Sequence, residues 1–160
     1  MINTTDLIEI ANKIVVKGKG ILAADESIGT IAKRFSKIKV ENTEENRRKY
    51  RQLLFTSKDI ENYISGVILF EESLNHKTDE GILFLDLLKS KNIIPGIKVD
   101  KGLKILSGEF HDEFVTQGID DLDIRCKEYY TKGIRFAKWR AVFEIKDSSV
   151  PSQVQLDLKI

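Results

Sequence analysis

Cysteine and histidine are scarce in this 160-residue chain. With a single cysteine, Cys126, it cannot form an internal disulfide, and such cysteine usage fits a reducing cytosol. The two histidines, His76 and His111, have no cysteine or histidine at the spacing of zinc ligands, which argues against a structural zinc site. We therefore expect a protein without a metal site.

The chain also lacks a dominant charge and a long apolar run. Its formal net charge is +1, so no global field favours nucleic acid or an anionic membrane, and any anion site must come from a local cluster. Residues 1–15 mix acidic with apolar side chains, and no run approaches the length of a membrane span. We expect a soluble, cytoplasmic protein with no nucleic-acid or membrane partner.

What is present is a regular alternation of patterns within a length that suits one ordinary domain. Short continuous apolar runs that end on charged residues are typical of buried parallel strands, and helical spacing separates them. Helices are predicted over residues 5–16, 31–35, 43–56, 79–91 and 120–133, and strands over 21–25, 64–70, 92–102 and 133–145. The intervals suit βαβ crossovers, so the sequence predicts a parallel α/β sheet.

Ionisable residues stand at the C-terminal ends of three of the four predicted strands. Because side chains two apart on a strand share a face, Lys98 is expected to point with Asp100, and Lys138 with Arg140, while Asp25 ends the first strand. One interpretation is a polar pocket with surplus cations that suits a phosphorylated substrate. The other is a structural ion-pair network. A lysine beside other cations has a lowered pKa, which permits proton transfer or Schiff-base chemistry, but spacing does not decide which lysine acts.

Six segments of the sequence, taken in order, resemble those of a known family. They are LAADES, TEENRRKYRQLLFT, GVILFEESL, PGIKVDKG, VTQGIDDL and FAKWR. Over roughly residues 5–152 the chain resembles the N-terminal half of class I fructose-bisphosphate aldolase. The resemblance implies an α/β fold, the N-terminal half of a TIM (β/α)₈ barrel with about four parallel strands and flanking helices.

The resemblance also implies an activity and its partners. The family is a carbon–carbon lyase (aldehyde-lyase) of the Schiff-base class. In glycolysis and gluconeogenesis it reversibly cleaves fructose 1,6-bisphosphate to dihydroxyacetone phosphate and glyceraldehyde 3-phosphate, without a cofactor. Its members are usually homotetramers.

Site residues follow from the same resemblance, position by position. Asp25 would assist proton movement at the carbon–carbon bond, and Lys138 would stabilise the charge of the carbinolamine. Thr30 stands where the family more often has serine, and it retains the hydroxyl. The residues implied to bind substrate or its phosphates are Ser27, Thr30, Arg34, Arg47, Lys98, Lys138 and Arg140.

Some of these residues have simpler interpretations. Ser27 and Thr30 are equally well explained as helix caps, and Arg47 is better explained by a solvated helix face than by a direct substrate contact. His76 and His111 lie in loop-like surroundings and are expected at the surface.

The resemblance weakens after Ser152. The segment QVQLDLKI does not resemble the helix that follows in the family, so we expect a partial aldolase domain over residues 1–152 and a divergent tail over 153–160. The family's Schiff-base lysine and its carboxylate acid/base lie on later strands. We therefore expect a truncated or frameshifted N-terminal fragment that is inactive alone. A non-catalytic phosphosugar-binding or interaction fragment, or a pseudogene product, is the alternative.

Overall fold

The structure, a computed structural model, describes residues 4–106 and 113–143. The chain divides into two compact units. The first comprises residues 1–98 and 129–137, and the second comprises residues 99–128 and 138–160. The predicted tail, 153–160, lies outside the described residues.

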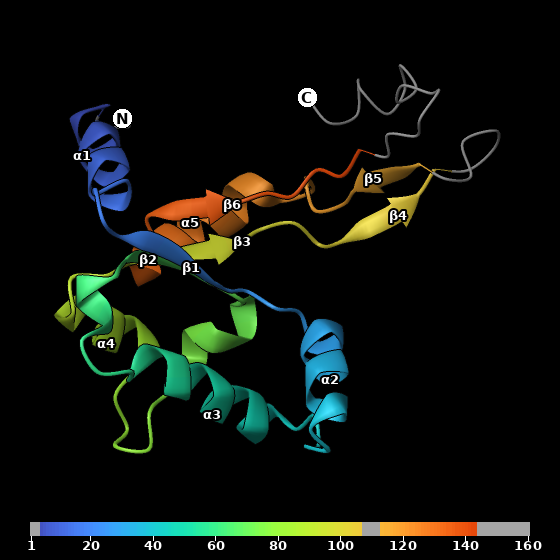
Figure 1. The fold of residues 1–160 in the computed structure, drawn as a ribbon. Coiled ribbons are helices and arrows are strands. Elements are labelled where there is room, and N and C mark those ends of the chain that lie inside the picture. Colours follow the sequence, from blue (N-terminus) through green and yellow to red (C-terminus); the bar gives the residue numbers. More distant parts are fainter. Residues whose placement is uncertain (1–3, 107–112, 144–160) are drawn as a thin grey trace. The chain divides into compact units, whose positions relative to one another are not determined.

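A four-stranded parallel sheet forms the centre of the fold (Figure 1). Its strands follow the order β1 (Gly20–Ala24), β2 (Ile64–Leu69), β3 (Ile94–Lys98) and β6 (Phe136–Lys138). Strand β2 pairs in parallel with β1 on one side and with β3 on the other. The predicted parallel α/β sheet is confirmed, with the four predicted strands as neighbours in chain order.

The inner strands are buried and the outer ones are not. Along β2 and β3 most residues are inaccessible, as the continuous apolar runs predict. Strand β1 differs, since Ile21 is 44% exposed and Ala23 is also exposed. The prediction of a buried first strand is wrong, because β1 stands at the edge of the sheet formed by the described strands, with β2 as its one neighbour among them.

Five helices accompany the strands in the described part of the chain. They are α1 (Thr4–Ile14), α2 (Ile28–Lys37), α3 (Glu44–Phe55), α4 (Phe84–Ser90) and α5 (Leu122–Lys132). The side chain of Thr43 accepts a hydrogen bond from the Asn46 N–H and so caps α3. The helix predicted over 79–91 is confirmed only over α4, because Lys77 and Leu83 form an isolated β-bridge just before it.

Four short elements were not predicted. Two are the 3₁₀ turns Ile60–Asn62 and Glu71–Asn75, and the others are the antiparallel strands β4 (Leu103–Ile105) and β5 (Phe114–Thr116) of the second unit. Conversely, the last predicted strand, 133–145, is reduced to the three residues of β6.

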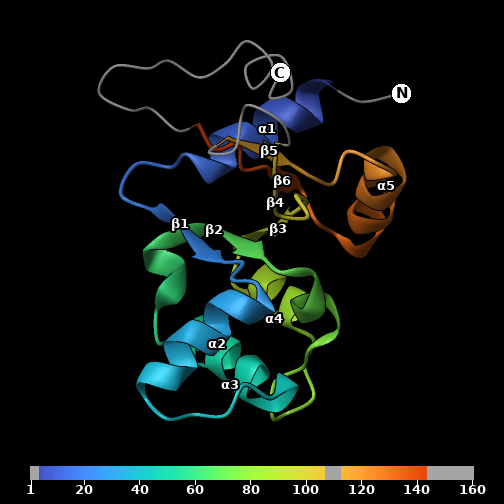
Figure 2. The same cartoon turned by 90° about the vertical axis from the view of Figure 1, so that its right-hand side faces the viewer.

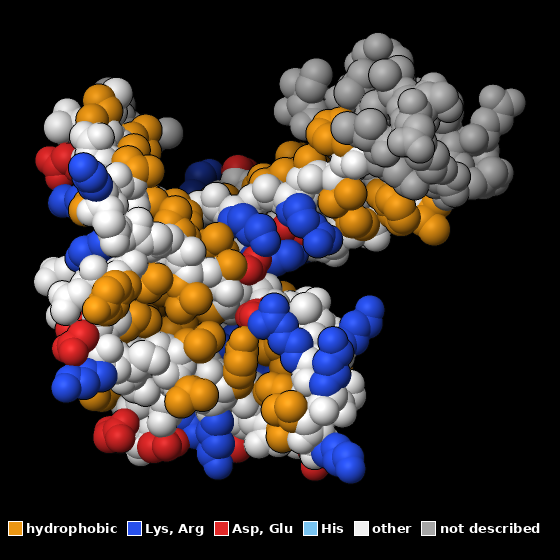
Figure 3. All heavy atoms as spheres, in the orientation of Figure 1, with side chains coloured by type: hydrophobic (Ala, Val, Ile, Leu, Met, Phe, Trp, Pro, Cys, Tyr) orange, Lys and Arg blue, Asp and Glu red, His pale blue; other side chains and the backbone are white. Residues whose placement is uncertain are grey.

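The core of the first unit lies between the sheet and the helices α3 and α4, which Figures 1 and 2 place on one side of β1, β2 and β3. The Phe55 and Phe84 rings meet edge to face there, 5.2 Å apart. His76 is also buried, edge-on to Phe84, so its prediction as a surface residue is wrong; His111 lies outside the described residues. Helix α1 has no buried residue, and Figure 3 shows its apolar side chains on the surface.

Candidate active site

The register of the sheet places Asp25 and Lys98 at the same level. Leu69 of β2 lies opposite Ala24 of β1 and Ile97 of β3, so the next residues along β1 and β3 form one row at the C-terminal edge. Asp25 is 7% exposed and Lys98 is half-buried. Adjacent strands lie about 4.8 Å apart, which puts the two backbones about 10 Å from each other.

Two hydroxyls stand at the N-terminus of α2, directly after this row. Ser27 Oγ accepts a hydrogen bond from the Thr30 N–H at 3.3 Å and lies 3.1 Å from Thr30 Oγ1. Ser27 is thus the N-cap of α2, as one of its two interpretations predicts. The positive end of a helix dipole also favours anions, so the cap does not preclude a phosphate contact.

Arg34, on the last turn of α2, is exposed but already paired. Its Nη1 donates to Glu26 Oε1 and, at 2.9 Å, to the Tyr50 hydroxyl. The Glu26 carboxylate raises the pKa of Arg34. An incoming phosphate would therefore compete with Glu26 for this guanidinium.

Arg47 is not on a solvated face. It is 7% exposed, and its Nη2 donates to Glu72 Oε2 at 2.6 Å while Nη1 donates to the Asn42 carbonyl at 3.1 Å. The prediction of a solvated face is wrong, because the Arg47 side chain is buried and bonds Glu72, which follows β2 in the sequence. The role of Arg47 in substrate binding stays a prediction.

Arg51 and Glu72 are central to this edge, and neither was predicted as a site residue. Arg51 is fully buried, and its Nη1 donates to Glu72 Oε1 at 2.8 Å. Burial lowers the pKa of Arg51, and Glu72 opposes that effect. Burial works to raise the pKa of Glu72, but hydrogen bonds from Arg47 and Arg51 outweigh it, so this pKa lies below its ordinary value. The available signal was the spacing of two arginines four residues apart on α3, with acids at the end of the next strand.

Lys138 and Arg140 belong to the second unit, whereas Asp25 and Lys98 belong to the first. The Lys138 carbonyl accepts from the Val99 N–H at 3.0 Å, and the Arg140 carbonyl accepts from Thr116 Oγ1 at 2.8 Å. These bonds fix the backbone of both residues within that unit. Convergence of Lys138 and Arg140 with Asp25 and Lys98 stays a prediction.

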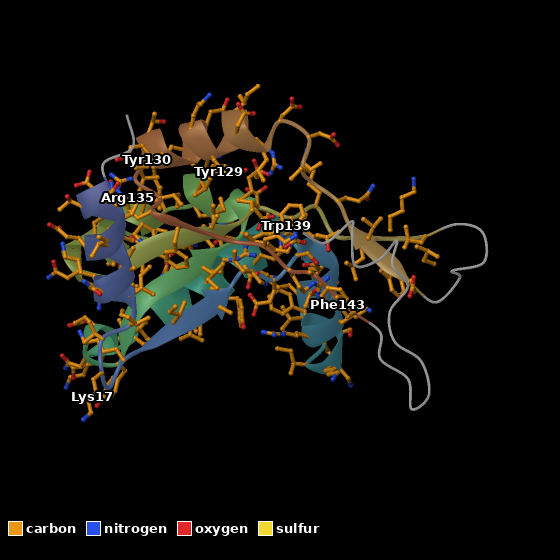
Figure 4. All side chains as sticks on the ribbon, turned by 90° about the horizontal axis from the view of Figure 1, so that it is seen from above. Lys17, Tyr129, Tyr130, Arg135, Trp139 and Phe143 are labelled. Carbon is orange, nitrogen blue, oxygen red and sulfur yellow. The ribbon has the colours of Figure 1, made fainter. Side chains whose placement is uncertain are left out.

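A cavity of about 530 Å³ lies at the other end of the sheet, near the N-terminal ends of β2 and β3. Its lining includes Ile10 of α1, Ser65 of β2, Pro95 of β3 and Arg135. The Arg135 guanidinium stacks on the Tyr130 ring, 4.4 Å from its centre (Figure 4). Neither Asp25 nor Lys98 lines this cavity.

Residues 4–106 and 113–143 contain neither a candidate metal-ligand cluster nor a membrane-spanning helix. No group of three or more histidine, cysteine, aspartate or glutamate side chains is placed to hold a metal ion there. Nor does that part of the chain contain a helix long and apolar enough to cross a membrane.

Comparison with known proteins identifies one family. The family model described as Fructose-bisphosphate aldolase class-I matches residues 6–158. Fructose-bisphosphate aldolase 1 of Toxoplasma gondii is 60% identical over 140 residues, which cover 88% of this chain and 38% of that protein. Cytosolic fructose-bisphosphate aldolase 7 of Arabidopsis thaliana is 58% identical, with coverages of 88% and 39%.

The fold agrees with the sequence match. The aldolase of Plasmodium falciparum, solved in complex with TRAP and a small-molecule inhibitor, superposes with a TM-score of 0.91 at 52% identity. That alignment covers 96% of this chain and 44% of the other. The chain thus spans about two fifths of the length of these relatives, and over that span it belongs to the class I fructose-bisphosphate aldolase family.

Proposed function

We propose that this chain carries the N-terminal part of an aldolase active site, for the reversible cleavage of fructose 1,6-bisphosphate into two triose phosphates. The observation that carries the proposal is the row of Asp25 and Lys98 at the C-terminal edge of a parallel sheet. In (β/α)₈ barrels the active site is built at that edge, and this chain belongs to a family with that fold.

The proposed residues divide into those that take part in the bond cleavage and those that bind the substrate or its phosphates. Asp25 moves protons at the carbon–carbon bond, and Lys138 stabilises the charge of the carbinolamine. Lys98 and Arg140 hold the substrate, and Arg47 remains a proposed further contact. The proposed phosphate contacts are Ser27, Thr30 and Arg34, and the two hydroxyls stand at a helix N-terminus that favours anions.

We further propose that the chain does not cleave the substrate by itself. Class I cleavage needs an amine that forms the iminium and an acid/base that carries protons through carbinolamine formation. In the family both groups lie on later strands. Lys98 and Lys138 are poor substitutes, because the sheet of the described residues does not close a barrel, so water enters and screens the charges around these amines.

Cellular setting and assembly are part of the same proposal. Relatives such as aldolase 7 of Arabidopsis thaliana are named cytosolic, which supports a cytoplasmic location. Fructose 1,6-bisphosphate and the triose phosphates are the proposed partners. A homotetramer is the assembly expected from the family.

The decisive experiment treats the chain with dihydroxyacetone phosphate and borohydride and measures its mass. We expect no cleavage of fructose 1,6-bisphosphate and no added mass. A stoichiometric adduct at Lys98 or Lys138 would overturn the proposal that the chain is inactive alone.

A binding comparison tests the site itself. Lys138→Ala is expected to weaken fructose 1,6-bisphosphate binding strongly, whether the chain is tested alone or complemented by the remaining part of an aldolase. Lys132→Ala, an exposed lysine at the end of α5, is the matched control and should leave binding unchanged. Equal losses in both variants would show diffuse electrostatic attraction in place of a site.

A further inference from the structure

The fully buried guanidinium of Arg51 bonds to the backbone on both sides of Asp25. Its Nη2 donates to the Glu26 carbonyl at 2.9 Å, and its Nε donates to the Ala24 carbonyl at 3.4 Å. Arg51 is 0% exposed, although arginine is almost never fully buried unless it is paired. The Arg51 side chain of α3 therefore fixes the backbone at the C-terminal end of β1.

Two carbonyls flanking one residue set the direction of the side chain between them. In an extended segment the carbonyls of residues i−1 and i+1 point the same way, along the hydrogen-bonding direction, and the side chain of residue i projects out of the sheet. If the Ala24 and Glu26 carbonyls are fixed, the Asp25 backbone cannot rotate freely. The rigid fork of the guanidinium suits this task, because its donors lie in one plane at fixed spacing.

The guanidinium is itself held in place. Its Nη1 donates to Glu72 Oε1 at 2.8 Å, and its central carbon lies 5.7 Å from the centre of the Phe70 ring. Glu72 is in turn fixed by Arg47, whose Nη2 bonds its other oxygen at 2.6 Å. Residues after β1 and after β2 are thus tied to one helix through a single connected set of charged groups.

We propose that Arg51 is a positioning residue for Asp25, and that it sets the orientation of this carboxyl through hydrogen bonds to the carbonyls of Ala24 and Glu26. The catalytic role of Asp25 rests on the proposed function, whereas the positioning can be tested without turnover. Arg51 does not act on the substrate, because its donors face backbone and Glu72 oxygens inside the first unit.

Arg47 offers a matched control for a merely structural role. Both arginines lie on α3, both are buried, and both bond Glu72. Arg51 bonds the carbonyls of the two residues that flank Asp25, whereas the other bonds of Arg47 go to Asn42. Replacing each by lysine keeps the positive charge and removes the fork.

The experiment follows the Asp25 carboxyl carbon by NMR in the full chain labelled at aspartate. We expect Arg51→Lys to change its chemical shift, because the hydrogen bonds to the carbonyls on both sides of Asp25 are altered, while Arg47→Lys leaves it unchanged. Melting temperatures of both variants are measured in parallel. If both variants lose the same stability and only Arg51→Lys changes the Asp25 signal, the result supports positioning. An unchanged Asp25 signal in a folded Arg51→Lys variant, or the same change in both variants, would overturn it.

A measurement on the unmodified chain covers the case in which Arg51→Lys does not fold. Scalar coupling across the hydrogen bond from Arg51 Nη2 to the Glu26 carbonyl carbon is expected, together with separate, slowly exchanging Nη protons. Arg34, which is exposed, should show averaged Nη protons. Averaged Arg51 protons without that coupling would overturn the proposal. Neither measurement depends on cleavage, so failure of the proposed aldolase function would be seen separately, in the borohydride experiment.

Discussion

The inner strands β2 and β3 and the outer strand β1 come from similar apolar runs and end in different environments. Val67 and Leu69 of β2 are 0% exposed and Ile97 of β3 is 1% exposed, whereas Ile21 of β1 is 44% exposed. Within the part of the chain that the structure describes, each inner strand has a partner on both sides, and β1 has one partner. How deeply a strand is buried in this sheet therefore depends on its position in the strand order, and the amino-acid composition of the strand does not determine it.

This difference has a consequence for where stability resides. Apolar area removed from water stabilises by about 25 cal/mol per Å², so the inner strands contribute most of the hydrophobic free energy of the sheet. Strand β1 contributes chiefly through its ladder with β2 and through the backbone contacts of Arg51. The predictions below compare the two environments.

The largest effect is expected from truncating an inner-strand side chain. Leu69→Ala leaves a cavity in a fully buried site and should lower the free energy of unfolding by about 2–5 kcal/mol. Ile21→Ala is the control on the outer strand and should cost less than about 1 kcal/mol, since much of its side chain is already in water. Urea denaturation of both variants measures the difference. Equal losses would show that β1 is as well buried as β2.

A second comparison adds a methyl group to the backbone, where the first truncates a side chain. An added Cβ at Gly96 of β3 would stand 2.4 Å from the Phe136 ring, while one at Gly20 of β1 would meet nothing within 4 Å. Gly96→Ala should therefore cost about 1–3 kcal/mol through overpacking.

Gly20→Ala is the control for this substitution and should leave the melting temperature unchanged or slightly raised. Thermal unfolding followed by circular dichroism distinguishes the two. A neutral Gly96→Ala would mean that β6 is not packed against β3 as described.

The sheet could be predicted because its signal is local, whereas the environment of each strand is not local. Apolar runs that end on Asp25 and Glu71 mark the ends of β1 and β2 to within two residues, whereas the strand predicted over 92–102 ends at Lys98. The run at Ile21 carries no sign that β1 pairs with one strand among those described, so the exposure of Ile21 could not be predicted. Strands β4 and β5 have three residues each, too few for a period-two pattern to be recognised.

The candidate site was predictable only in part for a related reason. Asp25 and Lys98 stand at strand ends, and each lies within its own motif of the family, LAADES and PGIKVDKG, which suffices to propose them. Arg51 lies in a helix rich in charged residues, where a solvated side chain is the usual outcome. Its burial depends on Glu72, 21 residues later, and on two backbone carbonyls. Such a contact follows from the tertiary fold and leaves no periodic trace in the sequence.

A third prediction concerns pH and the carboxylate that follows β2. The pKa of Glu72 is below its ordinary value of 4.5, so its stabilising effect is fully present above about pH 4.5 and is lost as the pH falls through the lower, folded-state value. Glu72→Gln should cost about 1–2 kcal/mol at pH 7, because two buried arginines lose a charged acceptor. The cost should shrink below pH 4.

Glu45→Gln serves as the comparison for that experiment. Hydrogen bonding to Arg48 holds the pKa of Glu45 at about 2, but this carboxylate is exposed on α3, and water screens the pair. We expect little change in stability at pH 7. Urea titrations at pH 7 and pH 3.5 separate the two variants, and a loss for Glu72→Gln that did not depend on pH would show that packing, and not charge, is responsible.

The smallest effect on stability is expected from a substitution on the exposed edge strand β1. Ile21→Lys should change the free energy of unfolding by no more than about 0.5 kcal/mol, because its site is 44% exposed and the lysine stem can lie along the strand. Its effect on association should be larger, since a charge on an exposed edge strand opposes pairing with a second chain. We therefore expect less light scattering on heating at an unchanged melting temperature. Lys19→Ile, at an exposed position just before β1, should act in the opposite direction and increase scattering. If Ile21→Lys unfolded the chain, β1 would have to be covered in solution, and the distinction between inner and outer strands would fail.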